Sequence, residues 1–194
     1  MIHLQARSLA AIAFLISIIS TGCVQVTFLT PMPPNKPNLN SFPEKWQGEW
    51  MATEEEDEAQ MSVCPSHIFF DDGLNELIVG SSCFVRKMGR KLVISLPQEE
   101  GERYSVYIAQ IRSETLTLQS FDPDDENAKE LWEDLLGDER VLLKHEEEND
   151  RARLVEIQLN PKSRWQFRRL VKHGATELTT FVKIDADDLK PSPN

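Results

Sequence analysis

The cysteines are the residues of this chain whose type and position most directly suggest chemistry. Cys23 follows an apolar run, LAAIAFLISII at residues 9–19, and three small residues at 20–22. A membrane-spanning helix needs roughly 20 apolar residues, so this run is too short to cross a bilayer comfortably. A short apolar core followed by small residues is typical of a secretory signal. We therefore expect residues 1–22 to be a cleaved signal peptide.

The stretch SIISTGCVQV, residues 17–26, resembles the lipobox of bacterial lipoproteins. In that family the cysteine directly after the cleavage point carries lipid, so the resemblance implies that Cys23 is the lipid attachment residue. Val24 stands where an Asp would resemble the signal for retention in the inner membrane, which implies an outer-membrane anchor and a body facing the periplasm. Ser20 departs from the Leu that the family prefers, and the alternative is a leader that is uncleaved or conventionally cleaved.

Cys64 and Cys83 are then left as a pair in a compartment that oxidises thiols, which predicts a disulfide between them. This bond would close a loop of 20 residues and would stabilise the fold by about 3 kcal/mol. Alternatively, His67 could lower the pKa of the Cys64 thiol and make it a redox nucleophile. A metal site formed with His67 and His145 is a further alternative, but these residues lack a recognisable ligand spacing, and we predict no metal and no cofactor.

The remaining polar residues match no catalytic motif. The sequence contains no nucleophile elbow, phosphate-binding loop, zinc-protease motif or dinucleotide-binding fingerprint. Its acidic runs at 54–58 and 146–148 repel internally and are typical of solvated loops. We predict no catalytic residue, and an enzyme with an unrecognised site is the alternative.

The charge balance argues against nucleic acid as a partner. The chain has 21 basic and 32 acidic side chains and a net charge of −11, whereas binding to phosphate backbones is dominated by positive charge. Its one basic concentration lies on a predicted helix and forms a candidate docking face for lipid phosphates or an acidic envelope protein. The alternative is that these cations pair with acidic groups of the chain itself. The face consists of Arg164, Arg168, Arg169 and Lys172.

Removal of the signal peptide leaves 172 residues, enough for one domain with a real core. Five prolines fall between positions 31 and 43, so we expect residues 23–43 to be a lipidated N-terminus followed by an extended, Pro-rich tether. The alternation of Val24, Val26 and Phe28 predicts the alternative, in which the start of this segment packs as an edge strand. Residues 44–190 should form the single globular domain.

From Trp46 onward the apolar residues recur with period 2, which predicts strands separated by short turns and therefore an antiparallel sheet. Leu92, Ile94 and Leu96, for example, share one face. The expected strands are 46–53, 67–71, 76–81, 83–88, 91–96, 103–111 and 115–121.

Two helices are predicted from their start signals and apolar spacing. Asp122 and Pro123 begin the first, which extends to 136, and Asn160 and Pro161 begin the second, which extends to 173. The two segments look alike at an offset of 38 residues, which suggests an internal duplication of a strand-helix-strand unit. The duplication predicts further strands at 140–145, 152–159 and 177–184. The fold class is therefore α+β, mainly an antiparallel sheet or partly closed barrel with two helices.

The stretch FPEKWQGEW, residues 42–50, resembles the opening strand of lipocalins, in which a Gly-x-Trp fills one end of a barrel. Gly48 and Trp50 are the matching positions, and the resemblance implies a lipocalin-like carrier of an apolar ligand. The alternative is that Trp46 and Trp50 are ordinary strand tryptophans. We expect foremost an outer-membrane lipoprotein that binds another envelope protein without catalysis, with the carrier and the enzyme as alternatives.

Overall fold

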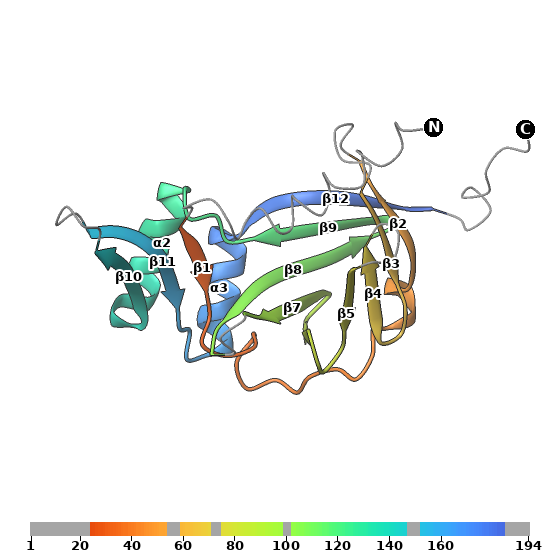
Figure 1. The fold of residues 1–194 in the computed structure, drawn as a ribbon, viewed down its shortest axis with the longest axis horizontal. Helices are drawn as coiled ribbons and strands as arrows, with labels where there is room; N and C mark the ends of the chain where they lie inside the picture. The colour runs from red at the N-terminus through yellow and green to blue at the C-terminus, as the bar shows by residue number, and fades with distance from the viewer. Residues whose placement is uncertain (1–23, 54–58, 71–74, 99–101, 147–151, 185–194) are drawn as a thin grey trace, which may run out of the picture.

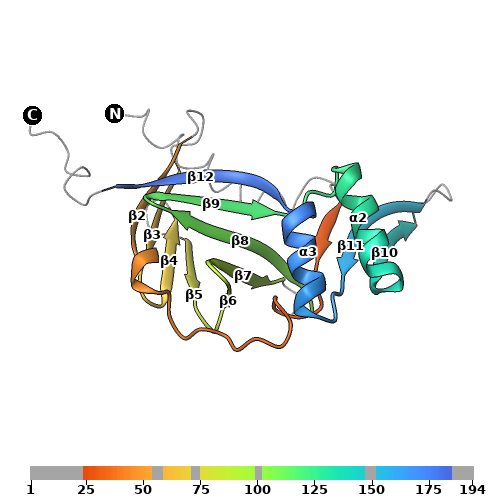
Figure 2. The ribbon, with the colours of Figure 1, turned by 180° about the vertical axis from the view of Figure 1, so that it is seen from behind.

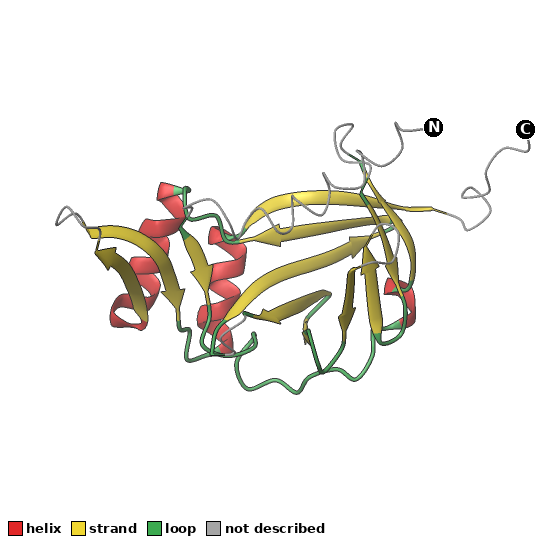
Figure 3. Ribbon diagram, viewed as in Figure 1, coloured by secondary structure: helices red, strands yellow, loops and turns green. Residues whose placement is uncertain are grey.

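The computed structural model of the protein describes residues 24–53, 59–70, 75–98, 102–146 and 152–184. Its larger sheet has nine antiparallel strands in the order β5-β4-β3-β2-β12-β9-β8-β7-β6 and is strongly curled into a partly closed barrel (Figures 1 and 3). This confirms the predicted α+β class. The strands are β2 (Gly48–Ala52), β3 (Gln60–Val63), β4 (His67–Phe70), β5 (Asn75–Ile78), β6 (Phe84–Met88), β7 (Lys91–Pro97), β8 (Tyr104–Arg112), β9 (Thr115–Ser120) and β12 (Thr176–Ile184).

A second, three-stranded sheet and two helices lie at one end of the curled sheet (Figures 1 and 2). In this small sheet β11 is central, with β1 parallel to it on one side and β10 antiparallel on the other. Two short 3-10 helices precede β2 and β10. The elements are β1 (Gln25–Thr27), β10 (Arg140–Glu146), β11 (Ala152–Leu159), α2 (Glu126–Leu136), α3 (Arg164–Gly174), η1 (Glu44–Trp46) and η2 (Gly137–Glu139).

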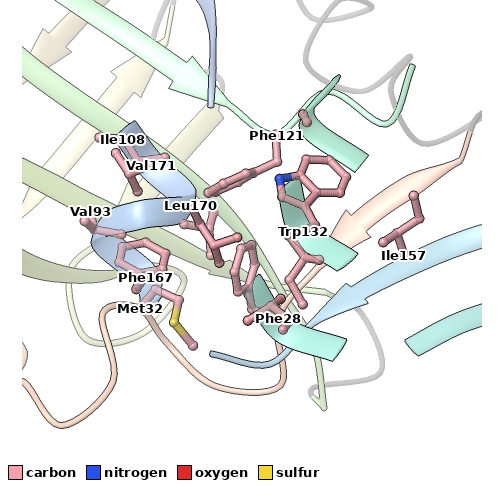
Figure 4. Packing of buried hydrophobic residues seen from close by; sticks show 14 residues of the cluster. Phe28, Met32, Val93, Ile108, Phe121, Trp132, Ile157, Phe167, Leu170 and Val171 are labelled. Atoms are coloured by element: carbon pink, nitrogen blue, oxygen red, sulfur yellow. The ribbon is translucent and has the colours of Figure 1, made fainter. Parts of the chain in front are cut away.

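The centre of β7 and β8 is buried on both faces. Leu92 and Ile94 belong to a cluster on the concave side of the curled sheet, which confirms that they share a face. Val93 and Ile108 point the other way, into a second cluster that includes residues of both helices and of β11 (Figure 4). Strands with a period of 2 usually bury one face, but here the helices and the small sheet cover what would otherwise be the solvent side.

The predicted duplication corresponds to two strand-helix-strand units, β9-α2-β10 and β11-α3-β12. Both bounds of the helices differ by 38 residues, 126 to 164 and 136 to 174. The outer strands pair crosswise, β9 with β12 and β10 with β11, and the two helices pack against each other. This is the arrangement that an approximate twofold axis between the helices would produce.

The Pro-rich segment is packed on the body, so the prediction of a free tether is wrong over the described residues 24–43. Phe28 is fully buried, and Met32 is nearly so. Leu39 N donates to Val85 O at 2.7 Å, and the segment follows one rim of the curled sheet before it enters β2 (Figure 1). The apolar side chains of this segment decide this outcome, because they bury more surface against the sheets than a solvated polyproline strand could.

Two further predictions need correction. β3 was not predicted, although Met61 and Val63 alternate with polar residues, because the strand has only four residues and follows the acidic run at 54–58. Both helices begin three residues later than expected, with Asp125 and Ser163 as the N-caps. Asp122 instead accepts a hydrogen bond from Asp124 N at 2.8 Å, in a turn that precedes α2.

Candidate functional site

The predicted lipid attachment residue, Cys23, and the predicted signal peptide lie outside the described residues. The described part of the chain begins at Val24, and β1 begins one residue later. β1 is held firmly, because Thr27 Oγ1 donates to the buried carboxylate of Glu156, which also pairs with Arg103. A lipid on Cys23 would therefore be attached next to an ordered strand. Within the described part of the chain no helix has the length and apolarity needed to cross a membrane.

The predicted basic residues gather on the exposed face of α3. Ser163 caps this helix in a capping box with Gln166, and Phe167, Leu170 and Val171 bury its opposite side. Arg164, Arg168, Arg169 and Lys172 are all exposed. None of the four forms an ion pair with an acidic group that the structure describes.

An exposed tryptophan lies among these cations. Trp165 is 59 % exposed, more than any other large apolar side chain that the structure describes. The guanidinium carbon of Arg169 lies 5.3 Å from the centre of its ring, a cation–π arrangement. Tryptophan and arginine are the side chains most enriched at the energetic centres of protein interfaces. The face of α3 is thus equipped both to attract an anionic surface and to bury an apolar ring against it.

Sequence reasoning missed the matching feature of α2. Glu126, Glu130 and Asp134 recur every fourth residue and are exposed. The carboxylate of Glu126 pairs with Lys129 at 2.8 Å, whereas Glu130 and Asp134 have no ion pair with a described residue. The 38-residue offset could have revealed this row, because it aligns the three acids with Arg164, Arg168 and Lys172. These six residues are called the paired charge rows below.

The Gly-x-Trp residues occupy the concave side of the curled sheet. Trp50 is completely buried, and its Nε1 donates to Trp46 O at 3.1 Å. Gly48 has φ +128°, and a Cβ there would lie 2.7 Å from Lys183 Cε. The ammonium of Lys183 donates to Gln47 O at 2.8 Å and lies 5.5 Å from the centre of the Trp50 ring. Trp50 thus fills the core inside the curled sheet, and Gly48 leaves room for the Lys183 side chain.

The two cysteines inside the domain are free thiols in the structure, so the predicted disulfide is not formed there. Cys83 is completely buried, and burial raises the pKa of its thiol to about 11. Cys64 lies in the β3–β4 turn, where its N–H donates to His67 O at 2.9 Å. A raised pKa leaves Cys83 in the unreactive thiol form.

Of the histidines whose side chains the structure describes, His67 lies next to polar groups of the kind that catalysis uses. Its Nδ1 lies 2.8 Å from Ser66 Oγ, and its Nε2 lies 3.4 Å from Glu76 Oε1. The His67 and Glu76 side chains are 36 % and 40 % exposed, on neighbouring strands β4 and β5, so solvent screens their interaction. No group of three potential metal ligands occurs among the residues that the structure describes. The side chain of His145 is not among them.

Comparison of the chain with models of protein families, with curated proteins and with solved structures found no match.

Proposed function

We propose that this protein is a lipid-anchored component of the bacterial outer membrane that faces the periplasm and binds another envelope protein without catalysis. The observation that carries the proposal is the exposed face of α3, where four cations and Trp165 lie unpaired with any described acidic group. In a chain with a net charge of −11, such a face is the natural contact for a row of acidic side chains on a protein partner. The lipobox-like stretch around Cys23 supports the anchor.

The packing of residues 24–43 changes how such an anchor would act. A tether of twenty extended residues would let the body move up to about 60 Å from the membrane. With Val24 directly before β1, the acylated Cys23 would instead keep the body at the membrane surface. Several acyl chains on one residue make release negligible, because each buried methylene contributes about 0.8 kcal/mol.

The carrier alternative requires an incompletely filled interior. On the concave side of the sheet, the large rings of Phe42, Trp46, Trp50 and Phe181 join one buried cluster with the aliphatic side chains of the opposite strands. These rings occupy part of the space that a carrier would need for its ligand, and native mass spectrometry of the purified protein would detect a bound lipid if a cavity remains. The contact between His67 and Glu76 is an isolated pair of potential catalytic groups. It supports an enzyme less strongly than the exposed face of α3 supports docking.

Two changes to the full-length protein test the two halves of the proposal in its native cell. Cys23→Ser should abolish incorporation of labelled fatty acid and leave the precursor uncleaved, and normal labelling would contradict the anchor. Arg168→Glu should leave labelling unchanged and reduce the recovery of crosslinked envelope proteins. Arg90→Glu, the same charge change in the exposed β6–β7 turn, is the matched control and should recover them normally. Equal recovery of crosslinked proteins from the wild type, Arg168→Glu and Arg90→Glu would contradict docking through α3.

A further inference from the structure

The paired charge rows carry opposite signs at equivalent positions of the two repeat units. Glu126, Glu130 and Asp134 on α2 correspond, at an offset of 38 residues, to Arg164, Arg168 and Lys172 on α3. Residues four apart lie on one side of a helix, so each row is a continuous stripe about two turns long. All six side chains are exposed. The two helices therefore carry opposite charges at equivalent positions of their outer sides.

The two helices present these rows side by side and run in opposite directions. Gln166, in the first turn of α3, has its Nε2 3.5 Å from Leu135 O near the end of α2. At the other end of α3, Gly174 packs against Trp132, one turn earlier in α2. Figure 2 shows both helices on the same side of the molecule. The acidic and basic rows are thus neighbours on one surface, antiparallel to each other.

We infer that a second copy of this chain binds this surface, with α2 of each copy lying along α3 of the other. In such a dimer the twofold axis runs parallel to the helices and passes between the helix pairs of the two copies. It brings opposite charges together in both halves of the contact. The antiparallel order of α2 and α3 then sets the register. Glu126 meets Lys172 of the partner subunit, Glu130 meets Arg168 of the partner subunit, and Asp134 meets Arg164 of the partner subunit. Each contact occurs twice.

Charge complementarity favours a second copy over an unrelated acidic protein. An acidic partner would satisfy α3 but would place its own carboxylates opposite Glu130 and Asp134, and like charges in an interface are unfavourable. Only a surface with one acidic and one basic row, arranged with the same spacing, satisfies both helices. The molecule itself supplies that surface. Trp165, on the same exposed side of α3, supplies the large apolar ring that such contacts usually contain.

The contact is small, so anchoring should matter for it. Each helix has 11 residues and is therefore about 16 Å long, and two such helices cover less surface than a stable interface usually buries. Attachment to one membrane raises the local concentration of the copies and favours a weak contact. The inference thus deepens the proposed docking function by naming its partner. It rests on the proposed anchor only for the strength of the contact between the copies.

Co-expression of two differently tagged, full-length copies tests this inference. After the envelope is solubilised in detergent, one tagged wild-type copy should capture the other. Glu130→Arg in both copies, or Arg168→Glu in both copies, places like charges together twice and should reduce capture about tenfold or more. A copy with Glu130→Arg mixed with a copy carrying Arg168→Glu restores opposite charges at both contacts, so capture should return to the wild-type level. Arg90→Glu in both copies is the control and should capture normally.

Rescue in the mixed pair excludes misfolding as the cause of lost capture. Absence of wild-type capture, or loss in the mixed pair as severe as in the single variants, would overturn the inference. Fatty-acid labelling of Cys23, read in the same cells, separates this failure from that of the anchor. A labelled protein that does not capture its copy leaves the anchor standing and overturns self-association. Capture by an unlabelled protein overturns the anchor and supports self-association.

Discussion

Gly48 is the residue at which backbone conformation and side-chain packing restrict the sequence together. Its φ of +128° disfavours any side chain, and a Cβ would lie 2.7 Å from Lys183 Cε. We expect Gly48→Ala to lower the free energy of unfolding by about 1–3 kcal/mol, the usual cost of a strained backbone residue. Urea denaturation followed by tryptophan fluorescence measures the change.

A companion variant separates the two causes at Gly48. Lys183→Ala removes the atoms that the new methyl group would meet, although it also removes the hydrogen bond to Gln47 O. In the Lys183→Ala background, the Gly48→Ala substitution should therefore cost less than it does in the wild type, and the backbone part of the cost should persist. An equal cost in both backgrounds would mean that moving the Lys183 side chain away from residue 48 costs no free energy.

Cys83 allows a prediction about pH. Burial raises the pKa of its thiol from the ordinary value of 9.0 to about 11, so the folded state holds this proton more tightly than the unfolded state. The corresponding stability is complete below about pH 9 and is lost as the pH rises toward 11. Cys83→Ala should flatten the pH dependence of the unfolding midpoint across this range. The same slope in the wild type and in Cys83→Ala would contradict the prediction.

Alkylation of the thiols tests whether Cys64 and Cys83 are joined by a disulfide. At pH 8, Cys64 should be modified first because it is half-buried, and Cys83 only after the chain unfolds. Unfolding without reductant should release both thiols. If neither reacts until reductant is added, the two cysteines are joined in the natural protein.

The elements that depend on local sequence signals were predicted well, whereas the segment that depends on burial against distant residues was not. The helices, their offset of 38 residues and the strand Ala152–Leu159 follow from apolar spacing and start signals within a few residues. The N-terminal segment was predicted as a tether because prolines dominate its composition. Its fate depends on Phe28 and Met32, which pack against residues far along the chain that a local pattern cannot identify.

The candidate site divides in the same way. The basic residues of α3 were visible in the sequence, because they stand out in an acidic chain. Whether they pair internally depends on which acidic side chains the fold brings near them, and that is a tertiary property. The acidic row of α2 passed unnoticed because acids are common in this sequence and gain meaning only when the repeat aligns them with Arg164, Arg168 and Lys172.

Phe28 tests whether the N-terminal segment belongs to the folded body. Its ring lies 5.2 Å from that of Phe121 and 6.1 Å from that of Phe167, centre to centre, and it is fully buried. Phe28→Ala should cost about 3–5 kcal/mol of unfolding free energy because it leaves a cavity in the core. Leu29→Ala, at the next residue and 48 % exposed, should cost less than about 0.5 kcal/mol. Urea denaturation that gives the same stability for both variants would indicate that the segment is a tether after all.

The whole molecule is built around a shared layer. β7 and β8 contribute one face to the cluster inside the curled sheet and the other face to the cluster under the helices. Neither cluster can be formed completely without these strands. The nine-stranded sheet, the helices and the small sheet should therefore fold together, and the single domain that we placed at 44–190 extends back through the segment that follows Cys23.

Substitutions on the two faces of the shared layer test this cooperativity. Leu92→Ala removes a side chain from the inner cluster, and Ile108→Ala removes one from the cluster under the helices. Each should cost about 2–5 kcal/mol of unfolding free energy, as such truncations do in cores. Because both clusters depend on the same two strands, each variant should shift one and the same urea transition, with circular dichroism and tryptophan fluorescence changing together. Two separate transitions, with Leu92→Ala lowering one and Ile108→Ala the other, would mean that the helical end and the curled sheet unfold independently, as two domains joined by β7 and β8.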